Sequence, residues 1–136
     1  METNMINVML VQAGRRPRMV EMEDSLEAMQ KMVGGYIEEY MPFEDDVALV
    51  CNEEGKMNGL ELNRAIFDEK GGLQDVIAGD FFICYAPVES ENFLSLPDDL
   101  AAKYGEKFKN PEQVMMMEDG IKVVPMKPKA VQRDER

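Results

Sequence analysis

The 136-residue sequence contains no histidine and no tryptophan, and it has only two cysteines. Without histidine, a serine or cysteine nucleophile lacks its usual general base, and an imidazole-ligated zinc site cannot form. Cys51 and Cys84 each lie in an apolar run, and no CxxC motif is present. We therefore expect two buried thiols that pack as small hydrophobes, with no metal and no cofactor. These absences favour a protein that is not an enzyme, and we predict no catalytic residue.

Basic residues are also scarce: 15 lysines and arginines stand against 27 acidic residues, which gives a net charge of −12 and a pI of about 4.4. Such a charge argues against direct binding to nucleic acid or to an anionic membrane. The first 20 residues nevertheless carry three arginines against one acid, and residues 121–136 carry five bases against two acids. The acid excess lies between them. It indicates either a solvated surface that keeps the protein soluble or a face that imitates nucleic acid.

The sequence has no N-terminal apolar run of signal-peptide or membrane-span length, so we expect a cytoplasmic protein. Its length suits one domain with its own core. We predict a single compact α+β domain over residues 1–111. An extension over residues 112–136 is expected to begin as an edge strand or loose chain and to end as a mobile basic tail.

Apolar and β-branched runs predict a mixed or antiparallel sheet of about five strands with two to three helices packed on it. The strands are expected at residues 5–12, 19–22, 36–41, 47–51 and 81–85. The helices are expected at residues 26–33, at residues 60–67, and between Ser95 and Asn110. The run at 47–51 has no polar interruption, so it should be the central strand, covered on both faces. Residues 73–78 are interpreted as a loop or a helical turn.

The first helix carries clear signals at both ends. Asp24 or Ser25 can cap its start, and Gly34-Gly35 can supply a left-handed C-cap. Gly34, Gly35 and the following Tyr36 can also be interpreted as a close approach of the backbone to a ligand.

The segment from Asn52 to Ile66 is the best candidate for a functional site. Asn52 and Asn63 offer amides that donate and accept, and Arg64 offers a planar fork suited to carboxylate or phosphate. If this turn folds back, these groups and Lys56 could converge with the N–H groups of residues 55–59 in an anion or nucleotide pocket. The alternative is an ordinary turn in which Arg64 pairs with an acid on its own helix.

We therefore predict a ligand site formed by Gly34, Gly35, Tyr36, Asn52, Lys56, Asn63 and Arg64. Neither G-x-x-x-x-G-K-[ST] nor G-x-G-x-x-G is present, so neither standard phosphate loop is available.

Three short motifs in order resemble domain-of-unknown-function family 3846. They are Leu-x-x-Met-Gln with Val-Gly-Gly-Tyr-Ile-Glu at residues 26–38, Asn-Glu-Glu-Gly-Lys with Gly-Leu-x-Leu-Asn-Arg at residues 52–64, and Ile-Ala-Gly-Asp-Phe at residues 77–81. The family's second motif more often has Pro before Asn-Arg, where this sequence has Leu62. The resemblance implies an uncharacterised accessory protein of phages, plasmids or conjugative elements of Gram-positive gut bacteria.

Two functional hypotheses follow. The first is a non-enzymatic binding protein for a small anionic ligand or a protein partner. The alternative is an acidic DNA-mimic inhibitor of a host defence nuclease, in which the acidic middle of the chain imitates a phosphate backbone.

Overall fold

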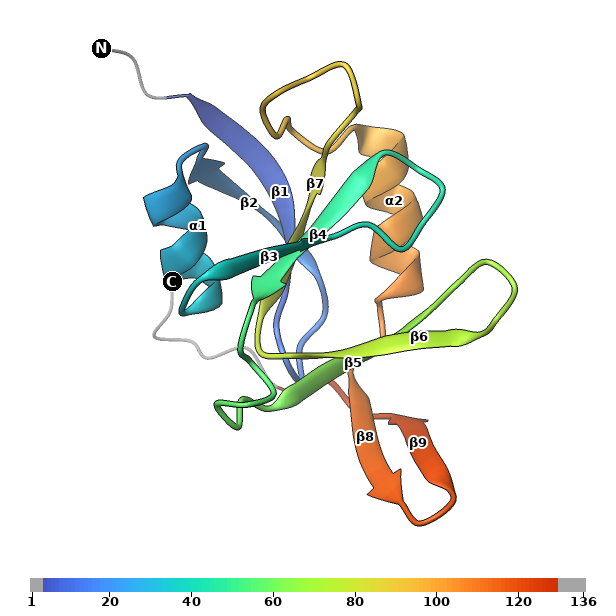
Figure 1. The fold of residues 1–136 in the computed structure, drawn as a ribbon. Helices are drawn as coiled ribbons and strands as arrows, with labels where there is room; N and C mark the ends of the chain where they lie inside the picture. Colours follow the sequence, from blue (N-terminus) through green and yellow to red (C-terminus); the bar gives the residue numbers. More distant parts are fainter. Residues whose placement is uncertain (1–3, 130–136) are drawn as a thin grey trace.

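The computed structural model describes residues 4–129, which form nine strands and two helices (Figure 1). The strands are β1 (Met5–Val11), β2 (Arg18–Glu23), β3 (Ile37–Tyr40), β4 (Val47–Asn52), β5 (Leu62–Phe67), β6 (Leu73–Ala78), β7 (Phe81–Tyr85), β8 (Glu112–Met117) and β9 (Gly120–Pro125). The helices are α1 (Leu26–Val33) and α2 (Asp98–Lys107). A five-stranded sheet has the order β2-β1-β7-β4-β3, and β5-β6 and β8-β9 form two smaller sheets. Every pairing is antiparallel, so the predicted α+β class and five-stranded sheet are confirmed.

Strand β7 is the middle strand of the large sheet, and β4, which was expected to be the central strand, lies between it and the edge strand β3. Both strands bury side chains on both faces. Side chains alternate along a strand, so a strand covered on both sides reads as an uninterrupted apolar run. One core contains Val47, Leu49, Cys51, Phe81 and Ile83. The other contains Ala48, Val50, Phe82 and Cys84. The predictions of a doubly covered strand at residues 47–51 and of two buried cysteines are confirmed.

Helix α1 covers one face of the sheet with Met29 and Val33. Its N-cap is Ser25, whose hydroxyl accepts the Ala28 N–H at 3.1 Å. Its C-cap is Gly34, which has φ +81° and donates its N–H to the Gln30 carbonyl. Glycine takes this left-handed conformation without steric cost, which is why the chain can turn here into β3.

Helix α2 and the β5-β6 hairpin cover the opposite face (Figure 1). Tyr104 and Phe108 enter the core from α2, and their rings meet Phe43 and Phe81. The Phe43 and Tyr104 centroids lie 5.2 Å apart, and Phe108 meets Phe81 edge to face at 5.7 Å. Such tilted and edge-on contacts are the favoured geometries of aromatic pairs.

Two sequence predictions in this layer are wrong. Residues 60–67, expected as a helix, contain strand β5, and residues 73–78, expected as a loop or helical turn, are strand β6. The intervening Gly71, with φ +84°, lies in the turn of a hairpin and does not end a helix. Asp68 holds that turn, because its carboxylate accepts the N–H groups of Lys70 and Gly72.

After residue 111 the chain forms the β8-β9 hairpin, which packs against β5. The Glu112 carboxylate accepts the Ala65 N–H at 2.9 Å, which ties the hairpin to β5. Beyond β9, the Lys129 N–H donates to the Gly14 carbonyl at 2.8 Å. The predicted mobile tail falls partly on residues 130–136, which lie outside the described residues.

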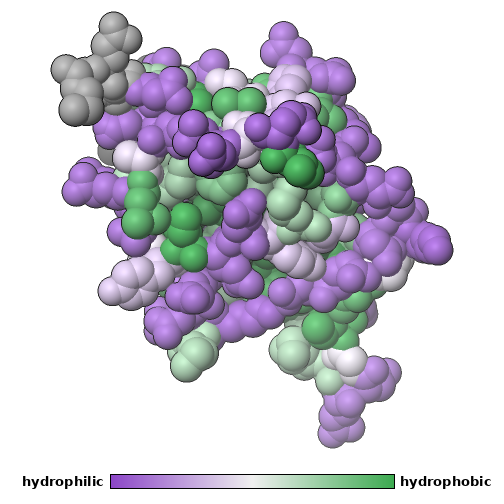
Figure 2. Space-filling model, turned by 45° about the horizontal axis from the view of Figure 1, so that its top comes forward, coloured by the Kyte–Doolittle hydropathy of each residue, from purple (hydrophilic) through white to green (hydrophobic). Residues whose placement is uncertain are grey.

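In the face drawn in Figure 2, hydrophilic side chains predominate and hydrophobic ones reach the surface between them.

Asp45 makes part of this fold dependent on pH. Its carboxylate accepts from Lys103 Nζ at 2.6 Å and Tyr104 OH at 2.8 Å, and these bonds lower its pKa. A lowered folded pKa gives stability that is present above the unfolded pKa of about 4 and is lost as pH falls through the folded value. Asp45→Asn should therefore lower the free energy of unfolding by about 1 kcal/mol at neutral pH and should change it less at a pH below the lowered pKa of Asp45.

Urea unfolding at both pH values would measure this difference. Asp46→Asn is the matched control, since Asp46 is exposed and its side chain makes no hydrogen bond within residues 4–129. An equal loss for Asp45→Asn at both pH values would contradict the assignment.

Candidate functional site

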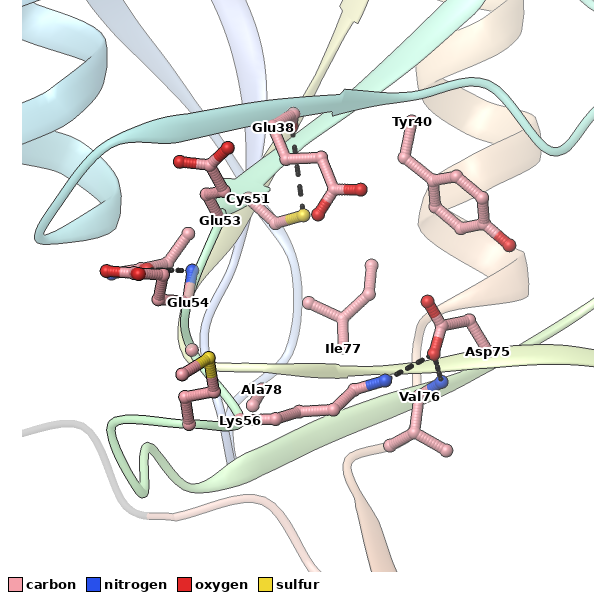
Figure 3. A pocket seen from close by; sticks show the side chains of 13 residues that line it. Glu38, Tyr40, Cys51, Glu53, Glu54, Lys56, Asp75, Val76, Ile77 and Ala78 are labelled. Carbon is pink, nitrogen blue, oxygen red and sulfur yellow. Dashed lines mark hydrogen bonds and ion pairs between the residues drawn. The ribbon is translucent and has the colours of Figure 1, made fainter.

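A cleft of about 140 Å³ lies between the edge strand β3, the end of β4, the turn that follows β4, and strand β6 (Figure 3). It brings together segments from three separate parts of the chain. Its lining residues are Glu38, Tyr40, Cys51, Asn52, Glu53, Glu54, Gly55, Lys56, Met57, Asp75, Val76, Ile77 and Ala78. Two of the predicted site residues, Asn52 and Lys56, are therefore brought to one cavity.

Asn52 fixes the start of the turn. Its Nδ2 donates to the Val33 carbonyl at 3.2 Å, and its Oδ1 accepts the Glu54 N–H at 2.8 Å. A Cβ on Gly35 would lie 2.7 Å from Asn52 Nδ2, so only glycine leaves room for this amide. The turn therefore returns against the end of α1, as the sequence predicted, but the amide is already occupied by backbone groups.

Gly55 and Lys56 connect the turn to β6. A Cβ on Gly55 would lie 2.6 Å from the Ala78 carbonyl oxygen, so the turn lies directly on the β6 backbone. From there Lys56 reaches Asp75, with 2.5 Å between Nζ and Oδ1. The two side chains remain 57% and 44% exposed, so this is a surface ion pair that contributes little to stability. Figure 3 shows the lysine chain extended along β6 toward Asp75.

The rim of the cleft is acidic and its interior is neutral. Four carboxylates, from Glu38, Glu53, Glu54 and Asp75, line it with a single base, Lys56. Burial, and then the nearby Glu38 carboxylate, raise the pKa of the Cys51 thiol to about 11. Burial and then Asp75 likewise raise the pKa of Tyr40. At neutral pH the cleft therefore presents carboxylates around an uncharged thiol, a phenol and the apolar side chain of Ile77.

Asn63 and Arg64 lie elsewhere, in the interior, and both side chains are 0% exposed. Both residues belong to strand β5, so the alternative in which Arg64 pairs with an acid on its own helix is wrong. Asn63 Nδ2 donates to the Val11 and Gly79 carbonyls, each at 2.9 Å. Asn63 Oδ1 accepts from the Arg64 guanidinium at 2.8 Å.

The Arg64 guanidinium joins three segments of the chain. It donates to the Arg15 carbonyl at 2.7 Å and to the Phe108 carbonyl at 2.9 Å. Burial lowers the pKa of Arg64, and Glu112 opposes that change. Arginine stays charged at neutral pH, so a buried cation is solvated here chiefly by carbonyl oxygens. With its donors used in this way, Arg64 holds the fold together and does not line the cleft.

The remaining predicted residues border the turn without entering the cleft. Gly34 is the C-cap of α1, and Tyr36 is 69% exposed while its carbonyl accepts the Glu53 N–H at 2.8 Å. The N–H groups of Gly55 and Gly59 donate within the turn. These residues therefore do not form the expected anion pocket. That pocket required free N–H groups, two amides and a guanidinium in one concavity.

Sequence reasoning missed Glu38, Tyr40 and Asp75 as cleft residues. Glu38 and Tyr40 are two positions apart in a predicted strand, a spacing that places them on the same face and could have indicated them. Asp75 gave no such signal, because its segment was not interpreted as a strand.

Among residues 4–129, no group of three or more Cys, Asp or Glu side chains is arranged so that it could hold a metal ion. Over the same range, neither helix has the length and apolar character needed to cross a bilayer.

Comparison with known proteins gives one match. The sequence model of a family described as "Domain of unknown function (DUF3846)" matches residues 6–109, which include the cleft and the Asn63–Arg64 pair. No curated protein and no solved structure matches the chain.

Proposed function

Because the chain belongs to DUF3846, a family whose description names no activity, we propose a function from the geometry of the cleft: it binds a protein partner that inserts a basic side chain. The chain then acts as a non-enzymatic binding protein. The contact that supports this most directly is the ion pair of Lys56 with Asp75, in which the cleft already holds an ammonium group.

The volume of the cleft favours a side chain over a metabolite. Pockets for drug-sized ligands have volumes of about 300–1,000 Å³. The cleft measures about 140 Å³, enough for one extended side chain. Its walls are also suited to lysine, whose methylene stem packs on apolar surface while its ammonium stays near water. Ile77 and Ala78 offer the apolar wall, and the rim carboxylates offer partners for the charge.

The charge of the rim selects against an anionic ligand at this site. Each carboxylate there repels an anion, and the single base is paired with Asp75. A basic partner, by contrast, is attracted over a distance by the net charge of −12, which speeds encounter.

Lys56 occupies the position that the partner's cation would take. Because both members of the pair are about half exposed, exchanging one ammonium for another costs little. The Asp75 carboxylate is held ready for either cation, since it also accepts the Val76 N–H at 2.7 Å.

Lys56→Gln should therefore strengthen binding of a lysine-containing peptide. The substitution removes the internal competitor and one positive charge, and we expect a roughly fivefold gain, the factor that about 1 kcal/mol gives. Asp75→Asn should weaken binding by a similar factor. A ¹⁵N NMR titration with a short glycine peptide carrying one central lysine measures both, with shifts expected at the amides of Glu38, Gly55 and Ile77.

A peptide with norleucine in place of lysine is the ligand control, because it keeps the stem and loses the charge. Equal binding of the two peptides, or weaker lysine binding by Lys56→Gln, would overturn the proposal. The second outcome would instead make Lys56 a contact for an anion.

The DNA-mimic alternative is supported by the same row of carboxylates, since a basic nucleic-acid-binding partner would also be attracted to it. The two functions differ in which carboxylates contact the partner: those of the cleft alone, or those of a wider acidic face. In the cleft, Glu38→Gln with Asp75→Asn should weaken partner binding far more than Glu89→Gln with Glu91→Gln, an exposed pair outside the cleft. Equal losses from both double variants would favour a charged face over a cleft.

A further inference from the structure

A second concavity, of about 630 Å³, is formed by the loop between β1 and β2 and by the chain that follows β9. It has the opposite charge from the cleft. Its lining residues are Gln12, Arg15, Arg16, Pro17, Arg18, Pro128 and Lys129. Four cations and no carboxylate therefore surround this space, in a protein whose net charge is −12. Segments near the two ends of the chain supply these charges together, although Lys129 follows Arg18 by 111 positions.

In the described part of the chain, no side chain occupies the guanidinium groups of this loop. Within residues 4–129, the Arg15, Arg16 and Arg18 side chains form neither an ion pair nor a hydrogen bond. Lys129 has only a long contact, 3.8 Å from Nζ to a Glu61 carboxylate oxygen, with both side chains more than half exposed. Like charges held close together repel one another, so a cluster of four cations with one long ion pair attracts an anion.

The backbone of the loop is held from several sides. Buried Arg64 donates to the Arg15 carbonyl at 2.7 Å, and Asp80 accepts the Ala13 N–H at 3.3 Å. The Lys129 N–H donates to the Gly14 carbonyl at 2.8 Å, which fixes the tail against the loop. A loop fixed before binding loses less conformational entropy when a ligand arrives.

We propose that this basic concavity binds the phosphate groups of a small phosphorylated molecule. Planar guanidinium forks match phosphate oxygens in pairs, and a volume of about 630 Å³ is that of a small-molecule site. A di- or triphosphate engages several of the four cations at once. A long nucleic-acid strand is disfavoured, because beyond the concavity it meets the acidic surface that carries most of the charge. In this arrangement Arg64 is a positioning residue for the loop.

A ¹⁵N NMR titration of the full chain with pyrophosphate tests the site. We expect saturable shifts at the amides of residues 12–18 that weaken between about 50 and about 300 mM KCl, since salt screens exposed charges. Arg16→Gln with Arg18→Gln should lower affinity by about tenfold for each arginine removed. Both arginines are exposed, so the double variant should fold.

Lys70→Gln with Lys109→Gln is the matched control: it removes the same charge from exposed positions outside the concavity. Parallel titrations with ATP and with inorganic tripolyphosphate separate the two sources of phosphate, since tighter binding of ATP than of tripolyphosphate assigns the site to nucleotides. Absence of shifts at residues 12–18 with any of these ligands, or an equal loss in the control variant, would overturn the proposal. So would tighter binding of a single-stranded oligonucleotide, which would make the loop a nucleic-acid contact.

Discussion

Replacing Arg64 by methionine is expected to remove about 3–5 kcal/mol from the free energy of unfolding. Methionine keeps much of the apolar volume and has no donor. The carbonyls of Arg15 and Phe108 and the Asn63 Oδ1 would lose buried partners. Each acceptor left unsatisfied costs about 1–3 kcal/mol, against a total of about 5–15 for a domain. Urea unfolding followed by circular dichroism measures the loss.

Arg16→Met is the matched control for this experiment. Arg16 is exposed and its guanidinium makes no hydrogen bond among the described residues, so the change should stay within about 0.5 kcal/mol. A loss of under about 1 kcal/mol for Arg64→Met would contradict the assigned role, because it would mean that water or neighbouring groups replace the guanidinium.

The second large effect is expected for Gly55→Ala, which should cost about 2–3 kcal/mol. The added Cβ would lie 2.6 Å from the Ala78 carbonyl oxygen, a backbone atom of β6 that can move only with its strand. The turn must therefore lift away from β6. Lys56 should then separate from Asp75, which changes the amide shifts of Asp75 and Val76 in NMR spectra and widens the cleft.

Gly105→Ala is a control for which the free energy of unfolding should change in the opposite direction. Gly105 lies inside helix α2, and an added Cβ meets only Met9 Cε, at 3.4 Å. Alanine is favoured over glycine in a helix by up to about 1 kcal/mol, so this variant should be as stable as the parent or more so. If Gly55→Ala behaved in the same way, the turn would not be fixed against β6 as described.

The sequence predicted the large sheet well and the smaller β5-β6 sheet poorly. Strands such as β4 and β7 carry uninterrupted apolar runs, and α1 carries both of its caps, so local chemistry identifies them. Strand β5 is buried almost throughout, so it shows no alternation. The apolar residues Leu62 and Ile66 are four positions apart, a spacing that suits a helix equally well.

The polar residues of β5 explain why the site could be predicted only in part. Asn63 and Arg64 have the chemistry of a ligand site, and sequence does not reveal that carbonyls of distant segments use their donors. The sequence locates Asn52 and Lys56 at the turn, because a turn is a local feature, and both residues line the cleft. The acidic partners across the cleft come from β3 and β6, and their proximity depends on tertiary packing.

The two proposed sites have opposite charges and different sizes, which keeps their ligands apart. The cleft of about 140 Å³ has an acidic rim, and the concavity of about 630 Å³ has a basic one. A cation is repelled from the second and a phosphate from the first. The sequence suggested two kinds of ligand, a small anion or a protein partner, and we propose a separate place in the fold for each.

Strands β4 and β7 supply alternate side chains to both cores, with Leu49 facing α2 and Val50 facing α1. The core on one face of the sheet therefore cannot unfold while the core on the other face stays packed, because both contain side chains of the same two strands. Heat or denaturant should therefore unfold the large sheet and both helices in one cooperative step. A protein built in this way has few half-unfolded forms for proteases to cleave.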